Sequence, residues 1–403
     1  MFDYINIEGF RSFKKVELNL GPLSVLIGPN NGGKSNFLDF LSFMAEAAAG
    51  KLEAGFNSRG GTGSIGFGFD WLRGKIVVEL RFRGESLAFG SEGWILLEGD
   101  QPGVRFKLKL DLDIISSEVE SEELIEEPTS DRPRPATIVR RDRTECIFRP
   151  SKATEGQEPE ERKVLQSKAE LAIFQVKDLN KFPVPYVLLD QFQKWAFYDD
   201  MHTGADAAIR RPGLVRPTFR LSGGGENLAS VLNSIQQQKP DTWSEILEIL
   251  HTAYPDFKTI TFPPEGGDGK VVLRWWERPH EREGVSANFL SDGTLKFLCL
   301  IAILKSPDPP PLICIDEPEL GLHPDWIKLV AELLQDAATR TQVIVATHSP
   351  YIVAKLEPEQ VIVTEKIDGA THLRQLKTAD LENFLKDFSL ADLWLSGEIG
   401  GRP

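Results

Sequence analysis

The sequence has few cysteines and no long apolar run. Only three cysteines, Cys146, Cys299 and Cys314, occur among 403 residues, and their spacing is not that of a metal site. We therefore expect buried core thiols. No apolar stretch approaches the roughly 20 residues that a helix needs to cross a bilayer. The first residues, MFDYINIEGF, lack the charged and then apolar order of a secretion signal, which favours a cytoplasmic protein.

Basic residues are also scarce relative to acidic ones. The chain has 46 Lys and Arg against 60 Asp and Glu, a formal net charge of -14. This balance argues against a surface that binds nucleic acid as a whole, although it does not exclude a local patch. The charge is uneven, because every charged residue between Asp111 and Glu127 is acidic, whereas residues 209–220 carry four arginines and no acid.

The hydrophobic pattern predicts an α/β fold. Short β-rich runs surround one helical stretch, NFLDFLSFMAEAAA, within the first ninety residues. Residues 75–113 alternate apolar with polar side chains, which predicts an antiparallel sheet with one wet face. Residues 114–137 are acidic and contain prolines, so we expect a mobile surface segment there. Helical patterns dominate residues 184–254.

A phosphate-binding loop is predicted at Gly28–Ser35. The stretch GPNNGGKS fits G-x-x-x-x-G-K-[ST], follows the apolar run LSVLI and precedes the helical stretch. Glycines allow backbone N–H groups to close around phosphate oxygens, Lys34 reaches the β and γ phosphates, and the Ser35 hydroxyl can bind Mg²⁺. The residues predicted to contact the nucleotide here are Gly28, Asn30, Asn31, Gly32, Gly33, Lys34 and Ser35.

Two carboxylates and a histidine follow apolar strands in the last third of the chain. LICIDEPE predicts a buried strand that ends in Asp316 and Glu317, where the first can hold Mg²⁺ and the second can polarise water. After a predicted helix, QVIVATHSP ends in His348. Since the carboxyl ends of neighbouring parallel strands form one crevice, we expect His348 beside Glu317.

Two stretches resemble the signature loop of ABC-type ATPases. LSGGG begins at Leu221 and LSDGT at Leu290. A signature loop starts a helix that packs beside the strand of the catalytic acid, a few tens of residues before it. LSDGT meets this condition, whereas LSGGG lies more than ninety residues upstream of Asp316, so we assign Ser291 and Gly293 to the signature.

Together these motifs resemble the ABC-type ATPases of the RecF, SMC and OLD group. The stretches GPNNGGKS, LSDGT, ICIDEPELGLHP and ATHSP carry the resemblance to the group, and WAFYDD, GENLASVL and LADLWLSGEIGG are similar to stretches of stand-alone OLD-like ATPases without a TOPRIM domain. The resemblance implies one ATPase head over residues 1–403, with its core in 1–113 and 255–365, an insertion at 114–254 and a tail at 366–403. A mixed sheet with helices on both faces and an antiparallel β lobe are expected.

The resemblance also implies a head-to-tail homodimer that holds two ATP molecules and Mg²⁺. Lys34, Ser35, Asp316 and Glu317 would act from one chain, and Ser291 and Gly293 from the other. His348 would contact the γ-phosphate. Leu322 and His323 would lie where such dimers touch, although His323 replaces the aspartate that transporter ATPases have there.

Three functions compete at this point. The favoured one is a nucleotide-driven switch for a separate effector protein such as a nuclease, as in OLD-like phage defence. The alternative is a RecF-like DNA-repair ATPase that clamps duplex DNA through Arg210, Arg211, Arg216 and Arg220. A transporter subunit is disfavoured by the long insertion. Because VIVTEKIDG offers Glu365 and Asp368 without a following DxD, we predict no nuclease activity in this chain.

Overall fold

The computed structural model describes most of the chain as two compact units. It covers residues 1–67, 75–83, 86–90, 93–97, 105–128, 134–150, 160–165, 167–176, 178–179, 181–265, 269–278 and 283–401. Unit 1 contains Met1–Gly21, Gly28–Trp195 and Ile362–Gln375. Unit 2 contains Pro22–Ile27, Ala196–Val361 and Leu376–Pro403. Both units combine helices with sheets, which confirms the predicted α/β class.

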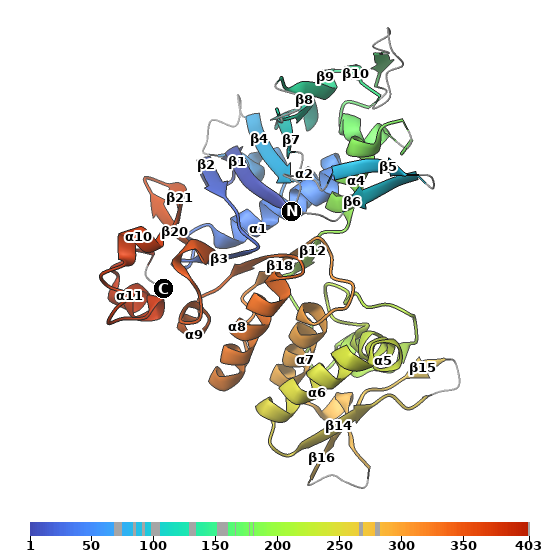
Figure 1. Cartoon of the computed structure of the whole chain (residues 1–403), viewed down its shortest axis with the longest axis vertical. Helices are drawn as coiled ribbons and strands as arrows, with labels where there is room; N and C mark the ends of the chain where they lie inside the picture. Colours follow the sequence, from blue (N-terminus) through green and yellow to red (C-terminus); the bar gives the residue numbers. More distant parts are fainter. Residues whose placement is uncertain are drawn as a thin grey trace. The chain divides into compact units, whose positions relative to one another are not determined.

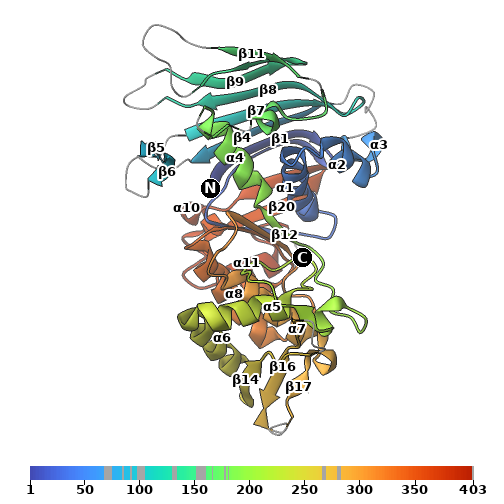
Figure 2. The ribbon, with the colours of Figure 1, turned by 90° about the vertical axis from the view of Figure 1, so that its right-hand side faces the viewer.

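Unit 1 is built on an eight-stranded antiparallel sheet in the order β11-β10-β9-β8-β7-β4-β1-β2, whose strands lie side by side in Figure 2. Most of these strands alternate buried and exposed side chains, as β2 does with Phe13, Val16 and Leu18 inward. The strands are β1 (Phe2–Phe10), β2 (Phe13–Asn19), β4 (Lys75–Arg83), β7 (Arg105–Asp113), β8 (Glu118–Glu126), β9 (Ala136–Asp142), β10 (Glu145–Phe148) and β11 (Glu161–Val164).

Helix α1 (Lys34–Ala48) covers this sheet with a row of phenylalanines. The ring of Phe10 on β1 contacts Phe40 edge to face at a centroid distance of 5.2 Å, and Phe13 meets Phe37 at 6.5 Å. Both pairs are fully buried. Aromatic contacts of this kind add to the free energy of apolar burial, so they hold the start of α1, and the loop before it, against the sheet.

The acidic segment expected to be mobile instead contains a strand. Residues 118–126 form β8, paired with β7 on one side and β9 on the other. Val119 and Leu124 point into the core, and the buried Glu122 carboxylate accepts hydrogen bonds from the backbone N–H groups of Ala172 and Ile173. Acidic composition misled the prediction because strand pairing uses the backbone, which carries no side-chain charge.

The remaining elements of unit 1 are short. A hairpin of β20 (Val361–Ile367) and β21 (Ala370–Gln375) comes from near the end of the chain and lies against β2. The others are α2 (Leu52–Ser58), α3 (Thr62–Ile65), the hairpin of β5 (Ser86–Gly90) and β6 (Gly93–Leu97), the 3-10 helix η2 (Ala172–Gln175) and α4 (Pro183–Gln193).

Unit 2 contains a parallel sheet whose strands occur in the order β12-β18-β19-β3. They are β12 (Ala196–Tyr198), β18 (Leu312–Asp316), β19 (Gln342–Ala346) and β3 (Leu23–Ile27). All five residues of β3 and β19 are buried, as continuous apolar runs in a parallel sheet require. Helices α7 (Asp292–Leu304) and α8 (Pro324–Ala338) pack side by side in this unit (Figure 1).

Further helices and small sheets complete unit 2. The longer helices are α5 (Leu228–Gln238) and α6 (Pro240–Ala253), and the short ones are η3 (Ala208–Arg210), η5 (Ala287–Phe289), α9 (Pro350–Val353), η6 (Pro358–Gln360), α10 (Thr378–Leu381) and α11 (Leu390–Ser396). The small sheets contain β13 (Gly213–Leu214), β15 (Lys270–Val271), β14 (Phe257–Thr261), β16 (Arg274–Glu277) and β17 (Val285–Ser286).

Two expectations from composition can be compared with these units. All three cysteines are free and buried, as predicted. Burial raises the pKa of the Cys146 thiol to about 12, so this thiol is unreactive at neutral pH. Over the part of the chain that the structure describes, no helix has the length and apolar character needed to cross a bilayer.

Candidate nucleotide-binding site

The predicted phosphate loop connects a buried strand to a helix, as the motif requires. It begins directly after β3 and ends in the first turn of α1. Gly28 and Gly33 have φ angles of 146° and 102°, and Asn31 has φ 69°. A side chain at Gly28 would strike the backbone oxygen of Thr364 at 2.3 Å. Only glycine therefore fits at position 28. Without a side chain there, a bound group can approach the backbone of the loop.

Lys34 folds back over this loop. Its ammonium group donates hydrogen bonds to the carbonyl oxygens of Gly28, at 2.8 Å, and Pro29, at 3.1 Å, and the residue is 5% exposed. Within the described ranges, no side chain caps the N-terminus of α1. The first N–H groups of an uncapped helix favour an anion. Gly32 is buried in the loop, whereas Asn30, Asn31 and Ser35 are exposed, so the loop fits a phosphate group.

Two threonines of the β20–β21 hairpin contact the loop, and the sequence analysis missed both. Thr371 donates a hydrogen bond to the Gly32 carbonyl oxygen at 3.1 Å. Thr364 is fully buried, and its hydroxyl, which faces Gly28 and Gly32, has no hydrogen-bond partner among the described residues. A buried hydroxyl without a partner is costly. The buried start of VIVTEKIDG, which includes Thr364, was the available signal, but the loop that this threonine faces lies over 300 positions earlier.

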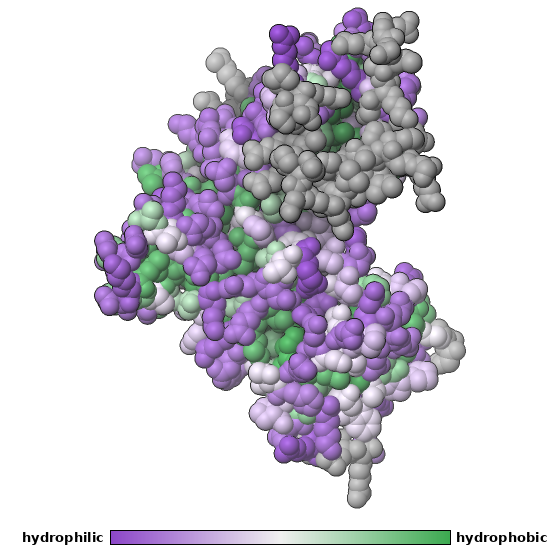
Figure 3. Space-filling model, in the orientation of Figure 1, coloured by the Kyte–Doolittle hydropathy of each residue, from purple (hydrophilic) through white to green (hydrophobic). Residues whose placement is uncertain are grey.

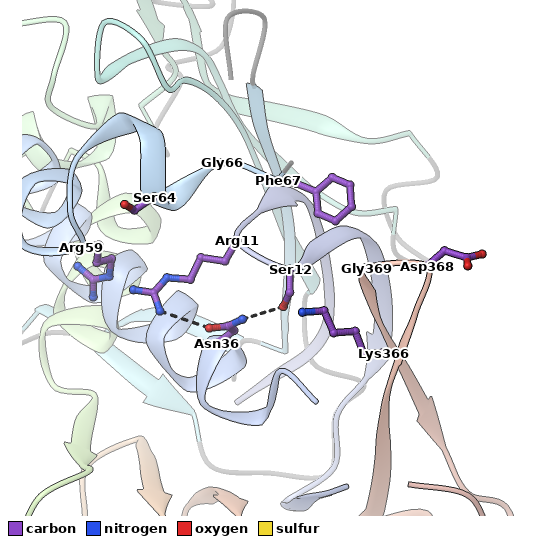
Figure 4. Close-up of a pocket in the computed structure, with 10 residues that line it drawn as sticks. All are labelled: Arg11, Ser12, Asn36, Arg59, Ser64, Gly66, Phe67, Lys366, Asp368 and Gly369. Atoms are coloured by element: carbon purple, nitrogen blue, oxygen red, sulfur yellow. Dashed lines mark hydrogen bonds between the residues drawn. The ribbon is translucent and has the colours of Figure 1, made fainter. Parts of the chain in front are cut away.

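A cavity of about 630 Å³, open to solvent, lies in unit 1 next to the start of α1 (Figure 4). Arg11, Arg59 and Lys366 give it three cationic side chains, and in the figure the Asp368 carboxylate points away from them. Arg59 is partly neutralised by Asp39 at 2.8 Å and by Glu46 at 2.7 Å, and Arg11 also pairs with Asp39, at 3.0 Å. The other lining residues are Ser12, Asn36, Ser64, Gly66, Phe67, Asp368 and Gly369.

Hydrogen bonds connect the cavity to the phosphate loop. The Asn36 amide donates to the Ser12 hydroxyl at 2.7 Å and accepts from Arg11 at 3.3 Å, as the dashed lines in Figure 4 show. The Thr371 hydroxyl contacts the Ser12 hydroxyl at 2.8 Å as well as the Gly32 carbonyl. The cationic cavity and the loop therefore belong to one polar network within unit 1.

In unit 2 the predicted carboxylates lie at the end of β18. Asp316 pairs in register with Ala346 of the parallel strand β19, and the Glu317 N–H donates to the Ala346 carbonyl oxygen at 2.8 Å. Glu317 has φ 47°, in the left-handed region that non-glycine residues rarely adopt. Strain of this kind costs about 1–3 kcal/mol and clusters at functional sites. It turns the side chain out of the strand direction.

His348 lies beside Glu317, where the sequence placed it. The distance between His348 Nε2 and Glu317 Oε1 is 3.8 Å, and both side chains are partly exposed. This is close enough for electrostatic attraction but longer than a direct hydrogen bond. Strands β18 and β19 are parallel neighbours, so their ends bring the two side chains together.

A further carboxylate, that of Glu319, binds the backbone of His348. Its Oε1 accepts a hydrogen bond from the His348 backbone N–H at 2.6 Å. Burial raises the pKa of Glu319, and the neighbouring charge of Glu317 acts in the same direction. The sequence analysis treated Glu319 as part of a motif and gave it no task. The signal was a second acid in DEPE, but only the fold shows that it turns inward.

The two signature candidates both precede helices. Ser291 caps α7, because its hydroxyl accepts from the Thr294 N–H at 3.0 Å, and a side chain at Gly293 would meet the Gly321 carbonyl oxygen at 2.4 Å. The LSGGG stretch forms a turn before α5, in which Gly225 has φ 83° and packs on Cys299 of α7. Local structure therefore does not distinguish the two candidates. The assignment of LSDGT as the signature rests on its spacing from Asp316 and stays a prediction.

Residues around the predicted dimer contact are exposed. Leu320 is 55% exposed and Phe289, two residues before Ser291, is 79% exposed. His323 has a local task, since its Nδ1 accepts from the Asp325 N–H at 3.3 Å and so caps α8, which follows Leu322. This cap explains how a histidine can stand where transporter ATPases have an aspartate.

One of the four arginines considered for DNA contact is not available to DNA. Arg210 is 7% exposed, and its guanidinium binds the Leu290 carbonyl oxygen and the Asp292 carboxylate within unit 2. That part of the prediction is wrong, because burial of a polar arginine among backbone carbonyls cannot be read from a basic stretch. Arg211 and Arg216 are exposed, and Arg220 is half-buried with Asp308 3.8 Å away.

A family model connects this geometry to known proteins. The model described as "AAA domain, putative AbiEii toxin, Type IV TA system" matches residues 23–354, which include the phosphate loop, the signature candidates, Glu317 and His348. The chain belongs to this family. Its fold agrees, because an Smc head bound to the C-winged helix domain of ScpA covers 94% of this chain and 99% of its own, with 15% identity and a TM-score of 0.55.

Two other relatives of this AAA-family chain are similar over different extents. An Smc head from Pyrococcus furiosus, bound to the C-terminal domain of ScpA, has a TM-score of 0.53 and 13% identity and covers 96% of this chain and 98% of its own. The "Retron Vc95 probable ATPase" of Vibrio cholerae serotype O1 biovar El Tor is 32% identical over 57 residues, which are 14% of this chain and 11% of that protein. The chain thus belongs to the AAA-domain family, and its fold is similar to that of the Smc heads.

Proposed function

We propose that the protein hydrolyses ATP in a head-to-tail homodimer and uses the cycle as a switch for a separate effector protein. The observation that carries this proposal is the Glu317 side chain, held on left-handed backbone 3.8 Å from His348 at the end of a buried parallel strand. An ATPase needs a carboxylate at this place to accept a proton from the attacking water.

Each residue of the site has a proposed task. Lys34 and the N–H groups of the phosphate loop would bind the phosphate oxygens of ATP, with the neutral loop glycines allowing close approach. Glu317 would take the proton of the attacking water while His348 contacts the γ-phosphate. Ser35 and Asp316 would hold Mg²⁺, which when bound neutralises negative charge on the phosphate oxygens.

The cavity beside the loop would take the rest of the nucleotide. Its volume of about 630 Å³ is in the range of small-molecule sites. Lys366 supplies positive charge, Arg11 shares its charge with Asp39, and Asn36 and Ser12 supply hydrogen-bonding groups that are already in the network of the loop. Neutral and cationic groups of this kind suit a sugar and a phosphate better than an apolar ligand.

The second copy would supply the signature loop. Ser291 is exposed at the start of α7, and Phe289 and Leu320 leave large apolar side chains exposed nearby. Exposed apolar side chains beside polar groups favour a protein contact. Ser291 and Gly293 of one chain would then complete the phosphate site of the other, where the helix N-terminus favours the γ-phosphate charge.

A separate effector is the proposed recipient of the switch. Phe384, Phe388 and Leu395 in the C-terminal tail are each about half exposed, and Figure 3 shows hydrophobic surface over the part that carries α9 and α11. The resemblance to OLD-like proteins and to a retron ATPase supports phage defence as the setting. A nuclease is the effector we propose, since we predict no nuclease activity in this chain.

Clamping of duplex DNA is the alternative function. The exposure of Arg211 and Arg216 favours it, whereas the net charge of -14 and the burial of Arg210 weigh against it. DNA that contacts these arginines should bind with an affinity that falls as salt rises.

Steady-state ATP hydrolysis measured against protein concentration tests the proposal. We expect the rate per chain to rise with concentration and to vanish in Glu317→Gln, which should still bind ATP. A rate per chain that is independent of concentration down to the monomer would refute the shared site. Stimulation by duplex DNA would favour the clamp, and cleavage of DNA by the purified chain would undermine a separate nuclease effector.

A further inference from the structure

Arg210 connects two segments of unit 2 that are distant in sequence. It ends the short helix η3, and its side chain is 6% exposed. On one side, its Nε donates to the carbonyl oxygens of Thr203, at 2.8 Å, and Gly204, at 3.0 Å. These bonds fix the guanidinium group to the loop that leads into η3.

On the other side, the same guanidinium binds the segment that enters the signature. Nη1 donates to three carbonyl oxygens, and Nη2 forms an ion pair with the carboxylate of Asp292, the first residue of α7. The three acceptors are Ala287 at 3.2 Å, Asn288 at 3.2 Å and Leu290 at 2.7 Å. Arg210 thus contacts residues on both sides of Ser291.

The contacts use a property that only arginine has. Its planar group presents five N–H donors in a fixed fork, so one side chain can satisfy several carbonyl oxygens that point to a common centre. The Ala287 carbonyl oxygen also accepts from the Leu290 N–H at 3.3 Å, so it keeps one partner without Arg210. Removing the guanidinium would take away the donor to the buried Leu290 carbonyl oxygen and release the entry to α7.

We propose that Arg210 is a positioning residue for the signature loop. It holds Leu290 to Asp292 in the geometry with which Ser291 and Gly293 act on the nucleotide bound by a second copy. This inference rests on the proposed shared site. The basic segment that contains Arg210 has the composition of a DNA contact. In this inference its Arg210 serves ATP hydrolysis instead.

Single variants separate this role from a general structural one. Arg210→Met should keep ATP binding, measured with a fluorescent ATP analogue, while kcat falls by at least about tenfold because the signature is displaced. Arg210→Lys keeps the charge but has fewer donors in no fixed fork, so an intermediate kcat is expected. Arg211→Met is the matched control, since Arg211 is exposed and its side chain donates only to the Asp206 carbonyl oxygen among the described residues.

Mixing two defective chains gives the decisive readout. Lys34→Ala lacks its own phosphate site but keeps its signature, so it should rescue Arg210→Met, whose own phosphate site is intact. After random pairing we expect about a quarter of the wild-type rate per chain, because half of the dimers are mixed and each has one intact site of two. Each variant alone should be nearly inactive.

A second pair distinguishes failure of this inference from failure of the shared site. Ser291→Arg mixed with Lys34→Ala should show the same rescue. If that pair is rescued and the Arg210→Met pair is not, Arg210 does not act through the signature. If neither pair is rescued, the shared site itself is refuted, and the inference with it. If Arg210→Met does not fold, the same two comparisons are made with Arg210→Lys.

Discussion

Replacing Gly293 by alanine tests how tightly the signature helix packs on the turn after Glu317. Gly293 has an ordinary backbone, so alanine is sterically allowed there except for one contact. Its Cβ would lie 2.4 Å from the Gly321 carbonyl oxygen, whereas real Cβ atoms essentially never approach closer than 3.0 Å. The helix or the turn must therefore retreat by at least 0.6 Å, the difference between these distances.

Two opposing effects decide the change in stability. Alanine is favoured over glycine in a helix by at most about 1 kcal/mol. Overpacking of this kind costs about 1–3 kcal/mol. The free energy of unfolding should therefore fall by up to about 3 kcal/mol, a drop of several degrees in the unfolding midpoint at about 2–4 °C per kcal/mol.

Turnover should fall much further than stability. The displaced turn contains Glu319, which holds His348, and a misplacement of about 1 Å can cost about 100-fold in rate. We expect kcat at saturating ATP to decrease by about 10-fold or more, with a folded protein by circular dichroism. Thermal unfolding and steady-state hydrolysis of the same preparation provide the comparison.

Gly321→Ala is the matched control on the opposite side of the contact. No atom lies within 4 Å of its added Cβ, but its φ is 77°, so alanine costs about 1–2 kcal/mol through backbone strain. Stability should fall while turnover stays close to wild type. A Gly293→Ala protein as stable and as active as wild type would show that the helix and the turn are not in tight contact. If Gly321→Ala loses as much activity as Gly293→Ala, the steric contact at Gly293 does not explain the loss.

Three further predictions follow from the same site. Burial raises the pKa of Glu319, so between the unfolded and the folded pKa the folded state holds a proton that the unfolded state has lost. The free energy of unfolding therefore falls as pH rises through this range. Glu319→Gln cannot lose this proton and should not show the fall. The difference in unfolding midpoint between that variant and wild type should shift in favour of the variant from pH 4 to pH 8. A difference that does not change with pH would contradict a raised pKa. Thr364→Val removes a buried hydroxyl that lacks a partner among described residues, so stability should be kept or increased, while weaker binding of an ATP analogue would show that the loop uses the hydroxyl. Gly223→Ala, whose Cβ would meet an ordinary contact at 3.5 Å, should leave hydrolysis intact if LSDGT is the signature, whereas Ser291→Arg should abolish it and spare ATP binding.

The sequence alone predicted the parts of the site that are short and continuous. The phosphate loop, its preceding strand and its following helix form one uninterrupted stretch, so glycine placement and apolar runs were enough to predict them. The same holds for the buried strand before Asp316 and Glu317. His348 required one further step, which the regular geometry of neighbouring parallel strands supplied.

Only the tertiary structure decided how side chains distant in sequence combine. Thr371 reaches the phosphate loop because a hairpin from near the end of the chain packs beside β2, and Arg210 turns inward because carbonyl oxygens before α7, including that of Leu290, accept from its guanidinium. The acidic strand β8 exists because β7 and β9 offer backbone partners on both sides. Side-chain type sets local preference along the chain, whereas hydrogen-bond satisfaction and burial depend on which segments the whole fold brings together.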